Sequence, residues 1–170
     1  MKCLLLSLFA LGAAGSLAGE DPTSNDMIVT SAHDIPWASS EGFNATRWKD
    51  ILGGDGAGQI PHEDIRFGLL QLAPNAVYPG HRHAAPEVYY VLSGTASWTV
   101  GSRSFIAAAG TTIYIPVNTI HRMVNQSDEV LTAVWAWWAP GGDRSVFDTD
   151  TYEFTEDIPD QSDLGFDDEE

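Results

Sequence analysis

Two short segments of the sequence carry side chains that could bind a metal ion. Residues 80–94 contain the pattern H-x-H-x3-E-x6-G, and residues 110–125 contain the pattern G-x5-P-x-N-x2-H-x3-N. Together they supply three imidazoles and one carboxylate, from His81, His83, His121 and Glu87. Such a set can bind one divalent transition metal and leave coordination positions open for a substrate. Iron, zinc, manganese and nickel all accept nitrogen and oxygen ligands, so the sequence does not select the metal.

The spacing of these residues indicates extended chain. His81 and His83 are two positions apart, which places both side chains on one face of an extended segment. Glu87 and Tyr89 share a face in the same way. His121 must then come from a neighbouring strand, because a small closed sheet can bring ligands from several strands to one point.

The rest of the chain predicts β-structure. From residue 65 onward, short runs of β-branched and aromatic residues alternate with Gly, Pro and Asn. The predicted strands are 66–73, 87–92, 96–100, 104–107, 112–115, 121–125 and 130–138. Residues 100–103 match a two-residue hairpin with Gly101 at the first turn position. Without a long amphipathic helix, the fold class is all-β, a sandwich or a barrel in a single domain.

The beginning of the sequence resembles an export signal. Residues 1–18 combine Lys2, an apolar run and small residues, which predicts a signal peptide and a secreted or periplasmic protein. Its removal would take away Cys3, the single cysteine of the chain, so no disulfide is predicted. A sequon at Asn44 would be used only in a host that glycosylates.

The remaining chain divides by composition. We predict an N-terminal extension at 19–64 with a short strand at 26–31, and a barrel at 65–142. Residues 143–170 hold half of the acidic side chains and few large apolar ones. They are predicted to form a partly disordered tail, of which 156–170 would be dispensable for activity.

The charge narrows the range of partners. The formal net charge is −16 at pH 7, and no basic patch interrupts it. A chain with this charge repels nucleic acids and anionic membranes. We therefore expect a small-molecule partner, with a homodimer as a further expectation.

Residues 65–138 resemble the cupin superfamily, whose two motifs match the two segments almost position by position. The one departure is Asn118, where those motifs usually have Gly; Asn tolerates the positive φ that such a turn requires. The resemblance implies a jelly-roll β-barrel with one bound metal. It specifies the fold and the metal much more closely than the reaction.

A narrower resemblance is to the cupin-type dimethylsulfoniopropionate (DMSP) lyases. It rests on residues 77–83 and 87–98, and on the aromatic run 135–138 followed by 141–143. Those enzymes release dimethyl sulfide and acrylate, and the resemblance implies that Tyr89 is the base. A sulfonium group is attracted to aromatic faces. The candidates for this cage are Tyr78, Trp98, Trp135 and Trp137.

Three functions are compatible with the sequence. The first is a metal-dependent carbon–sulfur lyase that acts by β-elimination on DMSP or a similar small carboxylate. The second is a cupin oxygenase with iron on the same ligands. The third is a noncatalytic exported cupin that binds a metal or a small molecule.

Overall fold

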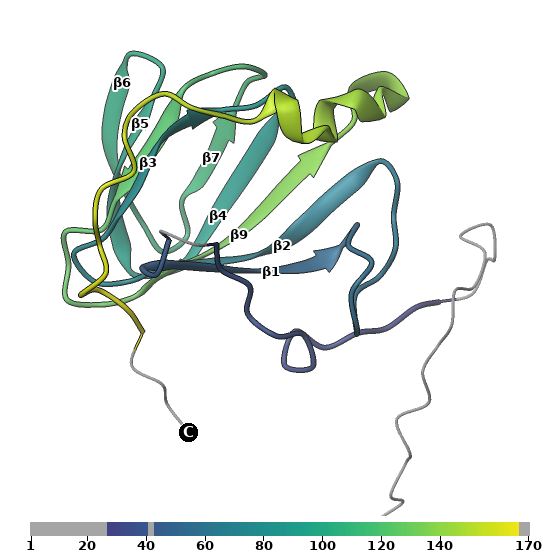
Figure 1. Cartoon of the computed structure of the whole chain (residues 1–170), viewed down its shortest axis with the longest axis horizontal. Helices are drawn as coiled ribbons and strands as arrows, with labels where there is room; N and C mark the ends of the chain where they lie inside the picture. The colour runs from purple at the N-terminus through teal and green to yellow at the C-terminus, as the bar shows by residue number, and fades with distance from the viewer. Residues whose placement is uncertain (1–26, 41–42, 167–170) are drawn as a thin grey trace, which may run out of the picture.

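The structure, a computed structural model, describes residues 27–40 and 43–166, and in them ten strands form two five-stranded sheets (Figure 1). The first sheet has the strand order β1 (Thr46–Leu52), β2 (Ile65–Leu72), β9 (Leu131–Trp138), β4 (Glu87–Ser93) and β7 (Thr112–Ile115). The second has the order β10 (Glu153–Phe154), β3 (Val77–Arg82), β8 (His121–Val124), β5 (Thr95–Val100) and β6 (Arg103–Ala108). All strand pairings are antiparallel.

The core lies between the inner faces of the two sheets. In β9, buried Leu131, Ala133 and Trp135 alternate with less buried residues, as the two-residue period of a strand requires. In β5, Trp98 is fully buried in the same core. Packing of this kind supplies most of the favourable free energy of folding. The predicted all-β class is therefore confirmed.

The seven predicted strands are all present, with ends that differ from the prediction by no more than one residue. The predicted hairpin is also present, because Val100 pairs with Arg103 and Gly101 has φ 56°. Asn118 has φ 55°, as its turn position predicted. Strands β1, β3 and β10 were not predicted. The strand predicted at 26–31 is wrong, since residues 27–31 form no strand.

The barrel extends beyond the predicted limits of 65–142. Strand β1 pairs with β2 along most of its length, so part of the predicted N-terminal extension belongs to the first sheet. The polar and charged residues of β1 explain why its sequence did not indicate a strand of the barrel. Asp50 lies on the inner face, while outward-facing Lys49 is covered by the segment before β1: its Nζ donates to the carbonyl oxygen of Ala32 and lies over the Trp37 ring.

The C-terminal segment also differs from the predicted tail. Residues 140–151 form three short 3-10 helices, η1 (Pro140–Gly142), η2 (Arg144–Phe147) and η3 (Thr149–Thr151). Strand β10 then pairs with β3, and the segment continues along the edge of the second sheet (Figure 1). Glu156 accepts hydrogen bonds from the backbone N–H of Gly80 and from Arg122. Acidic side chains here satisfy specific partners, which composition alone does not show.

Two predicted features fall wholly or partly outside the described residues. The signal peptide at 1–18 lies outside them, as do residues 167–170 of the acidic segment. Among the described residues, no helix is long and apolar enough to cross a membrane.

Gln161 holds the free edge of β3. Its side-chain amide accepts from the N–H of Val77 at 2.6 Å and donates to the carbonyl of Val77 at 2.9 Å, in place of a neighbouring strand. We predict that Gln161→Ala lowers the free energy of unfolding by about 1–3 kcal/mol, because it leaves two backbone groups unpaired. Thermal denaturation measures the change. Gln126→Ala, at an exposed position, is the control; equal melting temperatures for both variants would contradict the prediction.

Candidate metal centre

Four predicted ligands meet between the two sheets. His81 lies in β3 and His121 begins β8 in the second sheet, while Glu87 begins β4 in the first. His83 follows β3 directly and is buried on the same side as His81, with exposed Arg82 between them. One ligand atom from each of the four residues lies within 4.8 Å of the others, and all four residues are buried.

The backbone fixes the direction of each imidazole. The Nδ1 atoms of His81, His83 and His121 lie 2.9, 2.8 and 2.9 Å from backbone carbonyl oxygens, each two residues away along the chain. A carbonyl oxygen only accepts, so each Nδ1 carries the proton and donates it. In the neutral ring the lone pair is then on Nε2. Hydrogen bonds of this kind orient histidine ligands around metal ions.

The arrangement could hold a cation at its centre. Nε2 of His83 and Nε2 of His121 each lie 3.1 Å from Oε2 of Glu87. Nε2 of His121 is a buried nitrogen without a hydrogen-bond partner among the described residues. Lone pairs and a carboxylate that face one another in a dry interior repel unless a positive charge lies between them. The residues therefore fit a divalent transition metal, which these four ligands could hold.

The protonation of the ligands suits metal binding. Burial alone would raise the pKa of Glu87, but the adjacent imidazoles of His121 and His83 outweigh this effect and lower the pKa to about 2. Burial and the neighbouring charge of His121 lower the pKa of His81 to about 3. A carboxylate and a neutral imidazole are the forms that coordinate metals.

Trp137 orients the carboxylate from behind. Its Nε1 donates to Oε1 of Glu87 at 2.5 Å, and its ring lies 4.4 Å from the ring of His83, between centroids. The other carboxylate oxygen, Oε2, is thereby turned toward the histidines.

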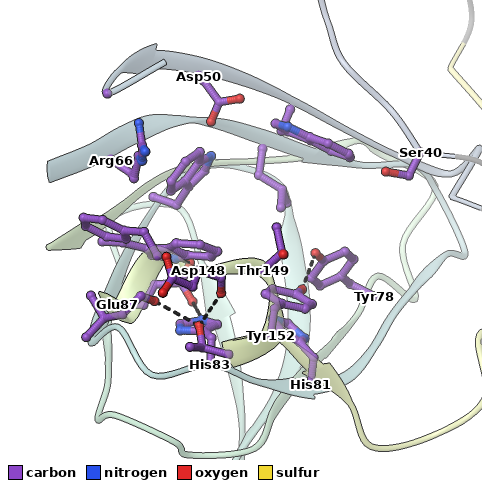
Figure 2. A pocket seen from close by; sticks show the side chains of 18 of the residues that line it. Ser40, Asp50, Arg66, Tyr78, His81, His83, Glu87, Asp148, Thr149 and Tyr152 are labelled. Atoms are coloured by element: carbon purple, nitrogen blue, oxygen red, sulfur yellow. Dashed lines mark hydrogen bonds and ion pairs between the residues drawn. The ribbon is translucent and has the colours of Figure 1, made fainter. Parts of the chain in front are cut away.

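Three of the four candidate ligands, His81, His83 and Glu87, line one end of a cavity of about 660 Å³ (Figure 2). Of the predicted aromatic residues, Tyr78, Trp135 and Trp137 line this cavity, and so does Tyr89. Trp98 does not: it is fully buried in the core, with its ring 5.0 Å from that of Tyr89. Trp98 was a candidate for the aromatic cage, but core residues fill the space around it.

Tyr89 is buried beside Glu87 on the inner face of β4. Burial, followed by the negative charge of Glu87, raises the pKa of Tyr89 well above its usual value. The protein side chains alone therefore keep this phenol protonated, and only a nearby cation would favour its phenolate.

Tyr152 is a cavity residue that the sequence did not reveal. Its hydroxyl lies 2.8 Å from that of Tyr78, and its ring stacks on His81 with 5.0 Å between centroids. Val146, Phe147 and Phe154 from the same C-terminal segment also line the cavity. The alternation of Tyr152 and Phe154 was the available sequence signal. Because the segment was assigned to an acidic tail, the signal was not used.

The cavity extends to the first two strands. Trp48 and Asp50 from β1 and Arg66 from β2 line it, and none of them was predicted as a site residue. Figure 2 shows Asp50 and Arg66 on one wall, across the cavity from Glu87 and His83.

His83 tests the site directly. We predict that His83→Ala removes most of the bound metal and lowers the melting temperature, because metal binding contributes to folding free energy. Elemental analysis and thermal denaturation measure the two effects. His33→Ala, at an exposed histidine, is the control. Unchanged metal content in His83→Ala would show that His83 is not a ligand.

A Trp137 variant tests the hydrogen bond that orients the Glu87 carboxylate. We predict that Trp137→Phe keeps an aromatic ring but weakens metal binding roughly 10- to 100-fold, because Glu87 loses the hydrogen bond that orients it. Competition with a chelator of known affinity measures this. Trp138→Phe is the matched control, since Trp138 follows on the opposite face of β9, where it stacks on Tyr114. A loss of the same size in both variants would contradict the prediction.

Sequence comparison identifies the family. Residues 68–137 match the family described as Cupin domain. An uncharacterized protein of Streptomyces coelicolor is 36% identical over 75 residues, which cover 44% of this chain and 71% of that protein.

Comparison with solved structures gives the same architecture. A structure of DMSP lyases matches with a TM-score of 0.58 and 20% identity, over 72% of this chain and 63% of that one. The DMSP lyase of Ruegeria pomeroyi matches with a TM-score of 0.57 and 18% identity, over 71% and 61%. This chain thus spans less than two thirds of either lyase chain, and at these identities the likeness concerns the fold. With the matched family and the four converging ligands, the chain belongs to the cupin superfamily, and its fold resembles that of the DMSP lyases.

Proposed function

We propose that this protein is a metal-dependent lyase that cleaves DMSP, or a similar small carboxylate, by β-elimination to dimethyl sulfide and acrylate. The observation that carries the proposal is the position of Tyr89. Its phenol lines the same cavity as three of the four candidate ligands, His81, His83 and Glu87, and it lies next to Glu87 on one strand face. The resemblance to DMSP lyases in both sequence motifs and fold supports the choice of substrate.

The reaction needs a base, a place for negative charge and a leaving group. The base removes a proton from the carbon α to the carboxylate. The electron pair of the broken carbon–hydrogen bond forms the carbon–carbon double bond, and the sulfur leaves with the electron pair of the broken carbon–sulfur bond as neutral dimethyl sulfide. A bound divalent metal would supply Lewis acidity toward the substrate carboxylate and stabilise the charge that develops.

The protein side chains have distinct parts in this scheme. Tyr89 is the proton acceptor, once a positive charge at the ligands offsets the effect of burial and of Glu87 on its pKa. The rings of Trp135, Trp137 and Tyr152 line the cavity and offer faces to a sulfonium cation. Because these walls are apolar, they also keep water away from the reacting carbon.

Removing the Tyr89 hydroxyl tests the proposal. We predict that Tyr89→Phe lowers the release of dimethyl sulfide by at least about a hundredfold, the usual contribution of a general base. The metal-loaded protein is incubated with DMSP without oxygen, and headspace dimethyl sulfide is measured together with metal content.

Tyr90→Phe is the matched control. Tyr90 is the next residue of β4, points outward and is 45% exposed, so this variant should keep the full rate and the metal. Full activity in Tyr89→Phe would eliminate Tyr89 as the base. Turnover that appears only with oxygen would favour the oxygenase, and no turnover on any substrate would favour a binding protein.

A further inference from the structure

The cavity is larger than the proposed reaction requires. At about 660 Å³, it falls in the range of roughly 300–1,000 Å³ typical of pockets for drug-sized ligands. DMSP is a much smaller zwitterion. The wall formed by β1 and β2 lies across the cavity from the metal ligands, and it carries charged side chains that the elimination does not use (Figure 2).

Arg66 is the cation on this wall. It shares the inner face of β2 with Gly68 and Leu70, and it is partly buried. Its guanidinium lies over the ring of Phe147, 5.2 Å from the ring centroid. Within the described residues its N–H groups meet no hydrogen-bond acceptor and its charge forms no ion pair. A guanidinium that faces a cavity and meets no acceptor from the protein has its donors open to a ligand, and an anionic ligand would bind them with charge-assisted hydrogen bonds.

Three of the other described arginines behave differently. Arg82, Arg122 and Arg144 each form an ion pair with a carboxylate, although all three are well exposed to solvent. Arg66 faces a cavity, where an ion pair would be stronger, yet it has none. The difference indicates that its donors are available to a bound molecule.

Asp50 does not act as the acceptor for the Arg66 guanidinium. It lies on the inner face of β1 close enough for the charge of Arg66 to lower its pKa, although burial has the larger effect and raises it. Its carboxylate is hydrogen-bonded to Trp48 and forms no ion pair with Arg66 among the described residues. Asp50 thus reduces the positive charge of the wall without occupying the guanidinium donors.

We propose that Arg66 binds a carboxylate at the end of the cavity remote from the metal ligands. The site would then prefer a ligand with a carboxylate at each end over one with a single carboxylate, and the favoured substrate would carry a second carboxylate beyond the reacting carbon. This inference rests on the proposed function only in placing the reacting end at the metal ligands. A planar guanidinium is suited to the role because it binds carboxylates with two parallel hydrogen bonds.

Binding measurements test the inference without turnover. The metal-loaded protein is titrated calorimetrically with straight-chain dicarboxylates from glutarate to pimelate, and with monocarboxylates of the same chain lengths. For at least one length, we expect the dicarboxylate to bind at least about tenfold more tightly, the gain from one charge-assisted interaction. Arg66→Gln should remove this preference and leave monocarboxylate affinity and metal content unchanged.

Two further variants sharpen the test. Asp50→Asn removes the competing negative charge and should tighten dicarboxylate binding. This effect is opposite in sign to that of Arg66→Gln. Arg103→Gln, at an exposed position on β6, should change nothing. If Arg66→Gln does not fold, Arg66→Lys replaces it, and the loss of two parallel hydrogen bonds should still reduce the preference.

Three results would overturn the inference: equal affinity for mono- and dicarboxylates at every length, a preference that survives in the Arg66 variant, or no binding of any dicarboxylate. The headspace assay separates this from the proposed function. A dicarboxylate preference without dimethyl sulfide release refutes only the choice of DMSP, and dimethyl sulfide release without the preference refutes only the role of Arg66.

Discussion

The convergence of four electron-pair donors on one point in a dry interior is the constraint on which the structure depends. Each histidine donates its Nδ1 hydrogen to a backbone carbonyl, and Nε2 of His83 and of His121 lies 3.1 Å from the carboxylate of Glu87. Such a cluster is unfavourable by itself and becomes favourable around a cation. The packing of the surrounding barrel must hold the donors together until the cation is bound.

This requirement explains why the site lies between the sheets rather than on one of them. Glu87 comes from the first sheet, and His81 and His121 come from the second, where they are paired across β3 and β8. Bringing the sheets together therefore assembles the four side chains, and a metal bound by them would hold the sheets together. Trp137 of the first sheet strengthens the link because it packs against His83, which follows β3 of the second sheet, and donates a hydrogen bond to Glu87.

The sequence predicted what depends on local spacing. His81 and His83 share a face whatever the rest of the chain does, because strand geometry has a period of two. The sequence did not predict the cavity residues whose positions depend on pairing between distant segments. Trp98 was predicted to be a cage candidate, but the packing around it holds it in the core, away from the cavity. Arg66 and Tyr152 reach the cavity only through the pairing of distant segments, β2 with β9 and β10 with β3. A single sequence carries no direct signal for such pairings.

The hydrogen bond between Tyr78 and Tyr152 has a consequence for how the protein is made. Tyr152 follows all four ligands in the chain, so the ribosome synthesises the ligands before the side chain that stacks on His81. We therefore expect that in a nascent chain without Tyr152 the ligands are accessible from the side that Tyr152 later covers. An ion could enter there before the last segment docks, so that metal acquisition precedes closure of its own entry route.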